Sequence, residues 1–339
     1  MDSEELKKYL NQIVNNNVKN SVMIWGPPGI GKSSVVSQVA EESGIGFIDL
    51  RLSQLAPTDL RGLPVAKEGI SSWYPPEFLP TKGKGILFMD EINMAPPTMQ
   101  GVAQQLVLDR KVGSYTVPED WLIWAAGNRK EDKASVFEMP APLANRFVHL
   151  SMQSDFDSFK AFALASGIHE HLIAFLSYRP QLLHKMDPNN QSWPSPRSWM
   201  MANDLYKADL EIYPAIGQAA AGEFEAYTAI YKKIPDLSKI TSGKGSNIAF
   251  PKEPDKQYAV VLGLTTRSKT TEEALNSFRW LTDYKNKKPR ANHEWTQLFA
   301  SDLFPLWRSR GKADELTDLV SKEEGIKEFL KDYMSLLAA

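Results

Sequence analysis

The 339-residue sequence contains no cysteine. This absence excludes thiol nucleophiles, thiolate metal sites, iron–sulfur clusters and disulfides. The sequence also has no run of about 18 apolar residues, which a membrane-spanning helix requires. Neither sign of charge dominates, because 39 Lys and Arg residues balance 41 Asp and Glu residues to a net charge of -2. We therefore expect a cytoplasmic protein with no membrane span, and the charge does not indicate nucleic acid as a partner.

Short apolar runs alternate with helical or loop segments over the first 150 residues. An amphipathic helix is predicted over 3–18, with Ser3 as its N-cap. The apolar runs that follow are bounded by turn residues and are predicted strands. They lie at 21–25, 47–51, 86–89, 121–125 and 146–150. Such alternation is typical of the α/β class with a parallel, doubly wound sheet.

Strand patterns nearly vanish after residue 150, and helical periodicity takes their place. The predicted helices lie at 157–166, 169–178, 197–208, 271–284 and 323–337. A polar, Gly-rich segment at 241–247 indicates a linker or a long loop. We therefore predict an α/β domain over 1–152, a helical domain over 153–240 and a mostly helical C-terminal region over 241–339.

A phosphate-binding motif lies between the first predicted strand and the next helix. Residues 26–33 read G-P-P-G-I-G-K-S and match G-x-x-x-x-G-K-[ST] in the context that this motif requires. Its amide groups can surround phosphate oxygens at the positive end of the helix dipole. Lys32 would reach the β- and γ-phosphates, and Ser33 would bind Mg²⁺. The alternative is a Gly-Pro turn followed by an exposed lysine. The predicted nucleotide-contacting residues are Gly26, Pro27, Pro28, Gly29, Ile30, Gly31, Lys32, Ser33, Ser34 and Asp90.

Two carboxylates and one amide follow later strands of the predicted sheet. Asp90 ends the strand at 86–89 and can hold Mg²⁺ together with Ser33, directly or through water. Glu91 is placed to take a proton from an attacking water. Asn128, at the end of another strand, can orient that water. The alternatives are solvated turn carboxylates and a turn asparagine that satisfies local backbone. The segment 128–132 does not fit Asn-Lys-x-Asp, so ATP is favoured over GTP.

With these motifs in place, the chain resembles the AAA+ ATPases, and among them the MoxR branch that includes CbbQ and GvpN proteins. Residues 90–97, D-E-I-N-M-A-P-P, are similar to that branch's extended Walker B segment. Residues 59–64 and 72–76 resemble parts of the branch's helix-2 insert, here about 58–80, which is usually a hairpin that faces the central pore of a ring. Residues 108–117 resemble the hairpin before sensor 1.

Two arginines are also similar to family motifs. Residues 140–147 resemble a segment that ends in Asp-Arg-Phe, whose arginine reaches into a neighbouring subunit, and this makes Arg146 the candidate arginine finger. Asn145 stands where the family has aspartate, so a charge beside that arginine is missing. Residues 195–198 resemble the sensor 2 motif of a lid helix, with Arg197 as a second phosphate contact. The alternatives are a surface arginine paired with Glu138 and an ordinary arginine at a helix N-terminus.

The resemblance implies a P-loop NTPase sheet as an AAA+ core, a helical lid and a C-terminal extension of unknown role. It also implies ATP and Mg²⁺ as cofactors, a homo-oligomeric ring of six subunits, and a chaperone-like action on a protein client. Family members often work with a von Willebrand A-type partner. Two alternatives stay open at this point. One is a nucleic-acid motor that uses the basic cluster at 285–290, and the other is a regulatory module that binds nucleotide without hydrolysis.

Overall fold

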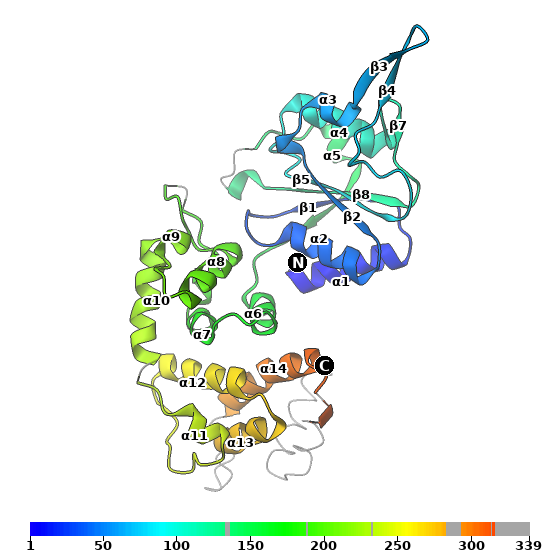
Figure 1. Cartoon of the computed structure of the whole chain (residues 1–339). Helices are drawn as coiled ribbons and strands as arrows, with labels where there is room; N and C mark the ends of the chain where they lie inside the picture. The colour runs from blue at the N-terminus through cyan, green and yellow to red at the C-terminus, as the bar shows by residue number, and fades with distance from the viewer. Residues whose placement is uncertain (133–135, 188, 232, 283–292, 313, 316–339) are drawn as a thin grey trace. The chain divides into compact units, whose positions relative to one another are not determined.

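The computed structural model describes residues 1–132, 136–187, 189–231, 233–282, 293–312 and 314–315, and it combines a five-stranded parallel sheet with many helices (Figure 1). The chain divides into two compact units, Met1–Asp155 and Phe156–Ala339. The predicted helix at 323–337 and the basic cluster at 285–290 lie outside the described residues.

Five parallel strands form the sheet of the first unit, in the order β2-β5-β8-β1-β9. Their bounds are β1 Ser21–Trp25, β2 Gly46–Arg51, β5 Gly85–Asp90, β8 Trp121–Gly127 and β9 Phe147–Ser151. β8 is buried along its whole length, and β5 is buried up to Asp90. β5 and β8 are therefore nearly continuous apolar runs in the sequence, which is why the sequence pattern located them.

Helices cover both faces of this sheet. The helices of the unit are α1 Ser3–Asn15, α2 Lys32–Glu42, α3 Pro57–Arg61, α4 Pro97–Asp109 and α5 Ala141–Ala144, with 3₁₀ turns at Leu52–Gln54 and Lys130–Asp132. Phe88 and Trp124 pack with α1 and α2, whereas Leu87 and Met89 pack with α4. The N-cap of α1 is Asp2 and not Ser3 as predicted, because the Asp2 carboxylate accepts the Glu5 N–H at 2.8 Å.

Two small hairpins extend the first unit. The first consists of β3 Leu63–Lys67 and β4 Ile70–Tyr74, and the second of β6 Lys111–Val112 and β7 Tyr115–Thr116. Figure 1 shows β3 and β4 projecting beyond the five-stranded sheet. The base of this first hairpin is tight, because a Cβ at Gly62 would lie 1.9 Å from the carbonyl oxygen of Tyr74. Ser114 joins the two hairpins by donating to the carbonyl of Trp73 at 2.6 Å.

The described part of the second unit is helical. Its helices are α6 Phe156–Ala165, α7 Glu170–Tyr178, α8 Pro196–Lys207, α9 Tyr213–Ile216, α10 Gln218–Tyr231, α11 Leu237–Thr241, α12 Pro254–Arg267, α13 Thr271–Leu281 and α14 His293–Ser309, with a 3₁₀ turn at Pro180–Leu182. One apolar cluster surrounds Phe175 and Trp199, and another surrounds Phe278 and Phe299. Both predicted parts, 153–240 and 241–339, contribute to this one compact unit, and a separate role for 241–339 stays a prediction.

A buried ion pair joins helices α6 and α14 of the second unit. Lys160 of α6 lies 2.6 Å from Asp302 of α14, and both side chains are almost fully buried. Burial raises the pKa of Asp302 although Lys160 opposes it. Within the described ranges, no helix is both long and apolar enough to span a membrane.

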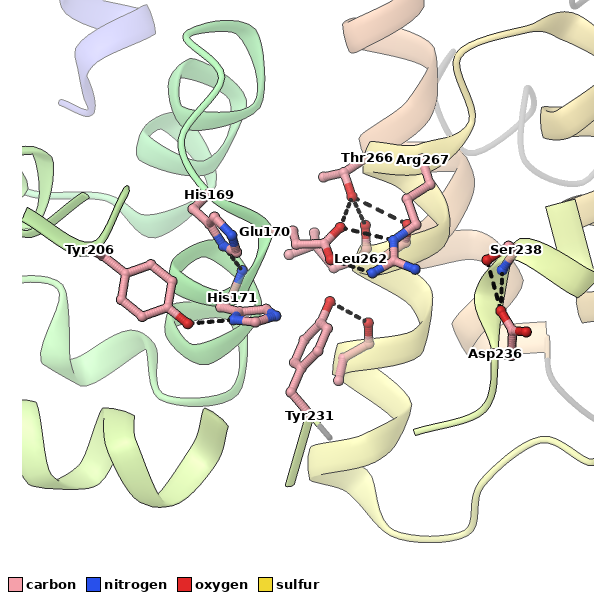
Figure 2. A network of polar contacts seen from close by, with 12 residues as sticks. His169, Glu170, His171, Tyr206, Tyr231, Asp236, Ser238, Leu262, Thr266 and Arg267 are labelled. Atoms are coloured by element: carbon pink, nitrogen blue, oxygen red, sulfur yellow. Dashed lines mark hydrogen bonds and ion pairs between the residues drawn. The ribbon is translucent and has the colours of Figure 1, made fainter. Parts of the chain in front are cut away.

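Helices α7, α8 and α12 of the second unit contribute to a polar network (Figure 2). Glu170 accepts hydrogen bonds from Arg267 at 2.7 Å and from Thr266 at 2.8 Å. Burial alone would raise the pKa of Glu170, but these hydrogen bonds outweigh it and the pKa is lowered. His171 lies 2.7 Å from the Tyr206 hydroxyl, and burial lowers its pKa to about 4. His171 is therefore neutral in the folded unit near neutral pH.

This depressed pKa predicts a loss of stability in mild acid. As pH falls below the ordinary histidine value of 6.5, the unfolded chain binds a proton at His171 that the folded unit does not bind until about pH 4. The free energy of unfolding should then drop by up to about 1.4 kcal/mol per pH unit across this window. Thermal unfolding between pH 7.5 and about 4.5 measures the slope. His171→Gln should flatten it, whereas Tyr206→Phe should keep it; equal slopes in both variants would contradict the assignment.

Candidate nucleotide-binding and hydrolysis site

The predicted phosphate loop connects β1 to α2. α2 begins at Lys32, so Ser33 and Ser34 lie in its first turn, where unpaired amides and the helix dipole favour anions. Gly31 has φ +97°, a conformation that glycine adopts without steric cost. A Cβ at Gly26 would lie 2.6 Å from the carbonyl oxygen of Met152. Both glycines are thus required by the observed loop.

Lys32 joins the phosphate loop to the end of β8. Its side chain is buried, and Nζ donates to the carbonyls of Gly26 at 2.7 Å and Pro27 at 3.0 Å. Nζ also donates to Oδ1 of Asn128 at 2.9 Å. The structure therefore brings together the predicted lysine and the predicted amide, which are 96 residues apart in the chain.

Ser33 and Asp90 provide oxygen atoms at the same place. The Ser33 hydroxyl donates to Oδ2 of Asp90 at 2.5 Å, and Oδ1 of Asp90 accepts the Glu91 N–H at 2.9 Å. A hydroxyl and a single carboxylate suit Mg²⁺, which binds proteins through few oxygen ligands and keeps several waters. Among the described residues, no group of three or more His, Asp or Glu side chains forms a metal cluster.

Ser53 contacts the candidate base Glu91 and was not anticipated from the sequence. Ser53 follows β2, and its hydroxyl donates to Oε2 of Glu91 at 2.6 Å. Glu91 has φ +56°, a left-handed conformation that is uncommon for a residue other than glycine. Such local strain often occurs at functional sites. The only sequence signal that could have indicated Ser53 is its place just beyond the carboxyl end of a predicted strand.

Asp49 adds a third carboxylate at this edge of the sheet. It lies on β2, which pairs with β5 so that Arg51 is opposite Asp90. Burial raises the pKa of Asp49, and so do the charges of Asp90 and Glu91, while Arg51 lowers it. A nearby cation would favour the ionised form of these carboxylates, so the donor set fits a bound Mg²⁺. No separate sequence signal marks Asp49, which has the pattern of an ordinary strand residue.

Asn93 holds the backbone of Asn128. Its Nδ2 donates to the Asn128 carbonyl at 2.6 Å, and its Oδ1 accepts the Asn128 N–H at 3.2 Å. A Cβ at Gly127 would lie 2.5 Å from this Oδ1, so the approach requires glycine. Asn93 lies in segment 90–97, which resembles the extended Walker B segment, but its position there does not indicate that its partner is Asn128.

The two candidate arginines, Arg146 and Arg197, take no part in the contacts described above. Arg146 follows α5, has an exposed side chain, and makes no ion pair with the part of the chain that the structure describes. The pairing with Glu138 that the sequence left open is therefore not observed. Arg197 is the second residue of α8, in the second unit, and its side chain is also exposed.

Comparison with known proteins gives the class of the first unit. Residues 22–147 match the family model described as "ATPase family associated with various cellular activities (AAA)". Most of the first unit is therefore similar to an AAA family ATPase domain.

Curated relatives match only in part. Midasin of Giardia intestinalis is 25% identical over 138 residues, which is 38% of this chain and 3% of midasin. The replication factor C large subunit of Methanococcus aeolicus is 33% identical over 57 residues, which is 17% of this chain and 12% of that protein. The chain thus spans a small fraction of the length of the curated relatives that it matches.

Solved structures with similar architecture include the NtrX protein of Brucella abortus in complex with ADP. It is 15% identical with a TM-score of 0.43, and the match covers 88% of this chain and 68% of NtrX. A RuvB mutant of Thermotoga maritima is 16% identical with a TM-score of 0.42, and the match covers 80% of this chain and 85% of RuvB.

The contact between Ser53 and Glu91 predicts a defect in turnover. Ser53→Ala removes a hydrogen bond to a carboxylate, and loss of one such bond corresponds to about a tenfold lower kcat. The KM for ATP should stay within about twofold, because Ser53 does not contact the phosphate loop. Steady-state ATPase kinetics measure both. Ser53→Thr keeps the hydroxyl and serves as the control; a raised KM with unchanged kcat would refute the assignment.

Proposed function

We propose that this protein is a Mg²⁺-dependent ATPase of the MoxR type, which forms a ring and remodels or activates a protein partner. The observation that carries the ATPase proposal is the set of contacts that joins Lys32 to Asn128 and Ser33 to Asp90, next to Glu91. These five side chains come from the phosphate loop and from the ends of β5 and β8, where sheets of this kind bind ligands.

Each of these residues has a distinct task in ATP hydrolysis. Lys32 neutralises phosphate charge, and Ser33 and Asp90 hold Mg²⁺, which supplies charge neutralisation on the phosphates when it is bound. Glu91 accepts the proton of the water whose oxygen bonds to the γ-phosphorus, and ADP leaves as the bond between that phosphorus and the β–γ bridging oxygen breaks. Asn128 orients the water. Ser53 fixes the Glu91 carboxylate, and Asn93 fixes the backbone of Asn128.

The proposed ring follows from the place of Arg146. Its exposed guanidinium is free to enter the site of an adjacent protomer, and the resemblance to the MoxR branch assigns it that role. A finger supplied by a neighbour accelerates phosphoryl transfer by about 10³- to 10⁵-fold. Contacts of this head-to-tail kind close into rings, and the resemblance indicates six subunits. Arg197 would contact phosphate from the lid.

The hairpin of β3 and β4 is the proposed contact with the protein partner. Leu63 and Ile70 are 72% and 70% exposed, and Val65, Trp73 and Tyr74 are also exposed. Exposed apolar side chains in a contiguous element indicate protein–protein contact. A pocket of about 720 Å³ lies beside the hairpin and is lined by Trp73, Gln105 and Lys111 among others. A von Willebrand A-type domain is the partner that the resemblance suggests.

Glu91→Gln tests the assignment of the base. The variant should bind ATP with wild-type affinity and hydrolyse it about 10²- to 10⁴-fold more slowly, because the amide cannot accept the proton. Nucleotide binding and phosphate release are measured on the same preparation, with Lys32→Ala as the variant that loses binding. Wild-type turnover in Glu91→Gln would show that Glu91 is not the base.

The stalled variant also tests the role of the hairpin. ATP-bound Glu91→Gln should hold its partner long enough for a photo-crosslinking residue at position 65 to label it in cell extract. The same residue at the exposed position 9, on α1, is the control. Labelling at position 9 with none at position 65 would contradict the proposed contact.

Mixing two inactive variants tests the trans arrangement. Lys32→Ala has no working site but an intact finger, and Arg146→Ala has an intact site but no finger. Each alone should lose about 10³-fold or more of the ATPase rate. Their mixture should regain activity, because the site of one protomer meets the finger of another. Absence of activity in a mixture that assembles, as shown by sedimentation, would refute a finger in trans.

A further inference from the structure

His149 connects the strand before the phosphate loop to the turn that precedes Arg146. The Nε1–H of Trp25 donates to Nδ1 of His149 at 2.8 Å. Nε2 of His149 lies 2.8 Å from the carbonyl oxygen of Ala144. Trp25 is the last residue of β1 and directly precedes Gly26, while Ala144 ends α5, two residues before Arg146.

The hydrogen bonds define the protonation of His149. An indole nitrogen is only a donor, so Nδ1 of His149 must accept and carries no proton. A carbonyl oxygen is only an acceptor, so Nε2 must carry the proton. Both bonds therefore require the neutral Nε2–H tautomer. The rings of Trp25 and His149 are nearly coplanar, with centroids 6.0 Å apart and planes at 14°.

The turn that carries Arg146 is flanked by two apolar anchors. Leu143 and Phe147 are buried on either side, whereas Asn145 and Arg146 are exposed between them. The Arg146 N–H donates to the Leu143 carbonyl at 3.1 Å. The bond from His149 to Ala144 is a polar side-chain contact that holds the end of α5 to the sheet, in addition to the apolar packing of Leu143.

We propose that His149 is a positioning residue that holds the Arg146 turn in register with the phosphate loop of the same protomer. This inference rests on the proposed role of Arg146 in the neighbouring site. The phosphate loop serves the ATP of its own protomer, whereas Arg146 serves that of the neighbour. The Trp25–His149–Ala144 chain then makes the placement of the finger depend on the strand that leads into the protomer's own nucleotide site.

The experiment uses the same mixture of Lys32→Ala and Arg146→Ala proteins. His149→Phe keeps a ring but loses both hydrogen bonds. It is introduced into one protein of the mixture at a time. The Lys32→Ala protein supplies the finger, and the Arg146→Ala protein supplies the site. In the finger-supplying protein it should lower the activity of the mixture about ten- to a hundredfold, because small misplacements of a catalytic group have large effects. In the site-supplying protein the activity should stay within about twofold of the unmodified mixture.

His149→Gln is the conservative control, since its side-chain oxygen can accept from Trp25 and its NH₂ can donate to Ala144. It should restore most of the activity in the finger-supplying protein. Equal losses in both proteins would show a merely structural role, and no loss in either would show no role; both results overturn the inference and leave the finger itself intact. A mixture without activity before His149 is changed overturns the trans finger and this inference together.

Discussion

The site of the first unit depends on the hydrogen bonds that the ammonium group of Lys32 donates. A buried cation needs polar partners, and here it binds two carbonyls of its own loop and the side chain of Asn128. These bonds hold the loop against the end of β8. The charge remains next to the helix N-terminus, where phosphate binds well. Asn93 in turn holds Asn128, so the loop, β8 and the segment after β5 form one connected arrangement around the lysine.

Periodicity and motif spacing located the elements and most of the proposed site. The strand at 21–25 agrees with β1 because a strand buried on both faces is apolar throughout. Lys32, Ser33, Asp90, Glu91 and Asn128 were found because each follows a strand or opens a helix at a recognisable spacing. Ser53, Asn93 and His149 were missed. Each is a single polar residue whose partner lies 38, 35 or 124 residues away, and no local pattern encodes such a pairing.

The packing of the second unit was harder to predict from the sequence, for a different reason. Helical periodicity located α6, α7 and α8 to within a residue or so at each end. It does not say which helices share a core, since any amphipathic helix can pack on several others. The polar network around Glu170 and the pair of Lys160 with Asp302 join segments far apart in the chain. Burial and partner charges that exist only after folding shift the pKa values of Glu170 and Asp302.

α12 contributes to both apolar clusters of the second unit. Ala259 and Leu262 belong to the cluster around Phe175, whereas Val260 and Leu264 belong to the cluster around Phe278. An element that two cores share cannot detach from one without exposing the other. The two clusters should therefore melt as one cooperative block, and a fragment that ends before α12 would keep the earlier helices of the unit but leave their inner surface open to water.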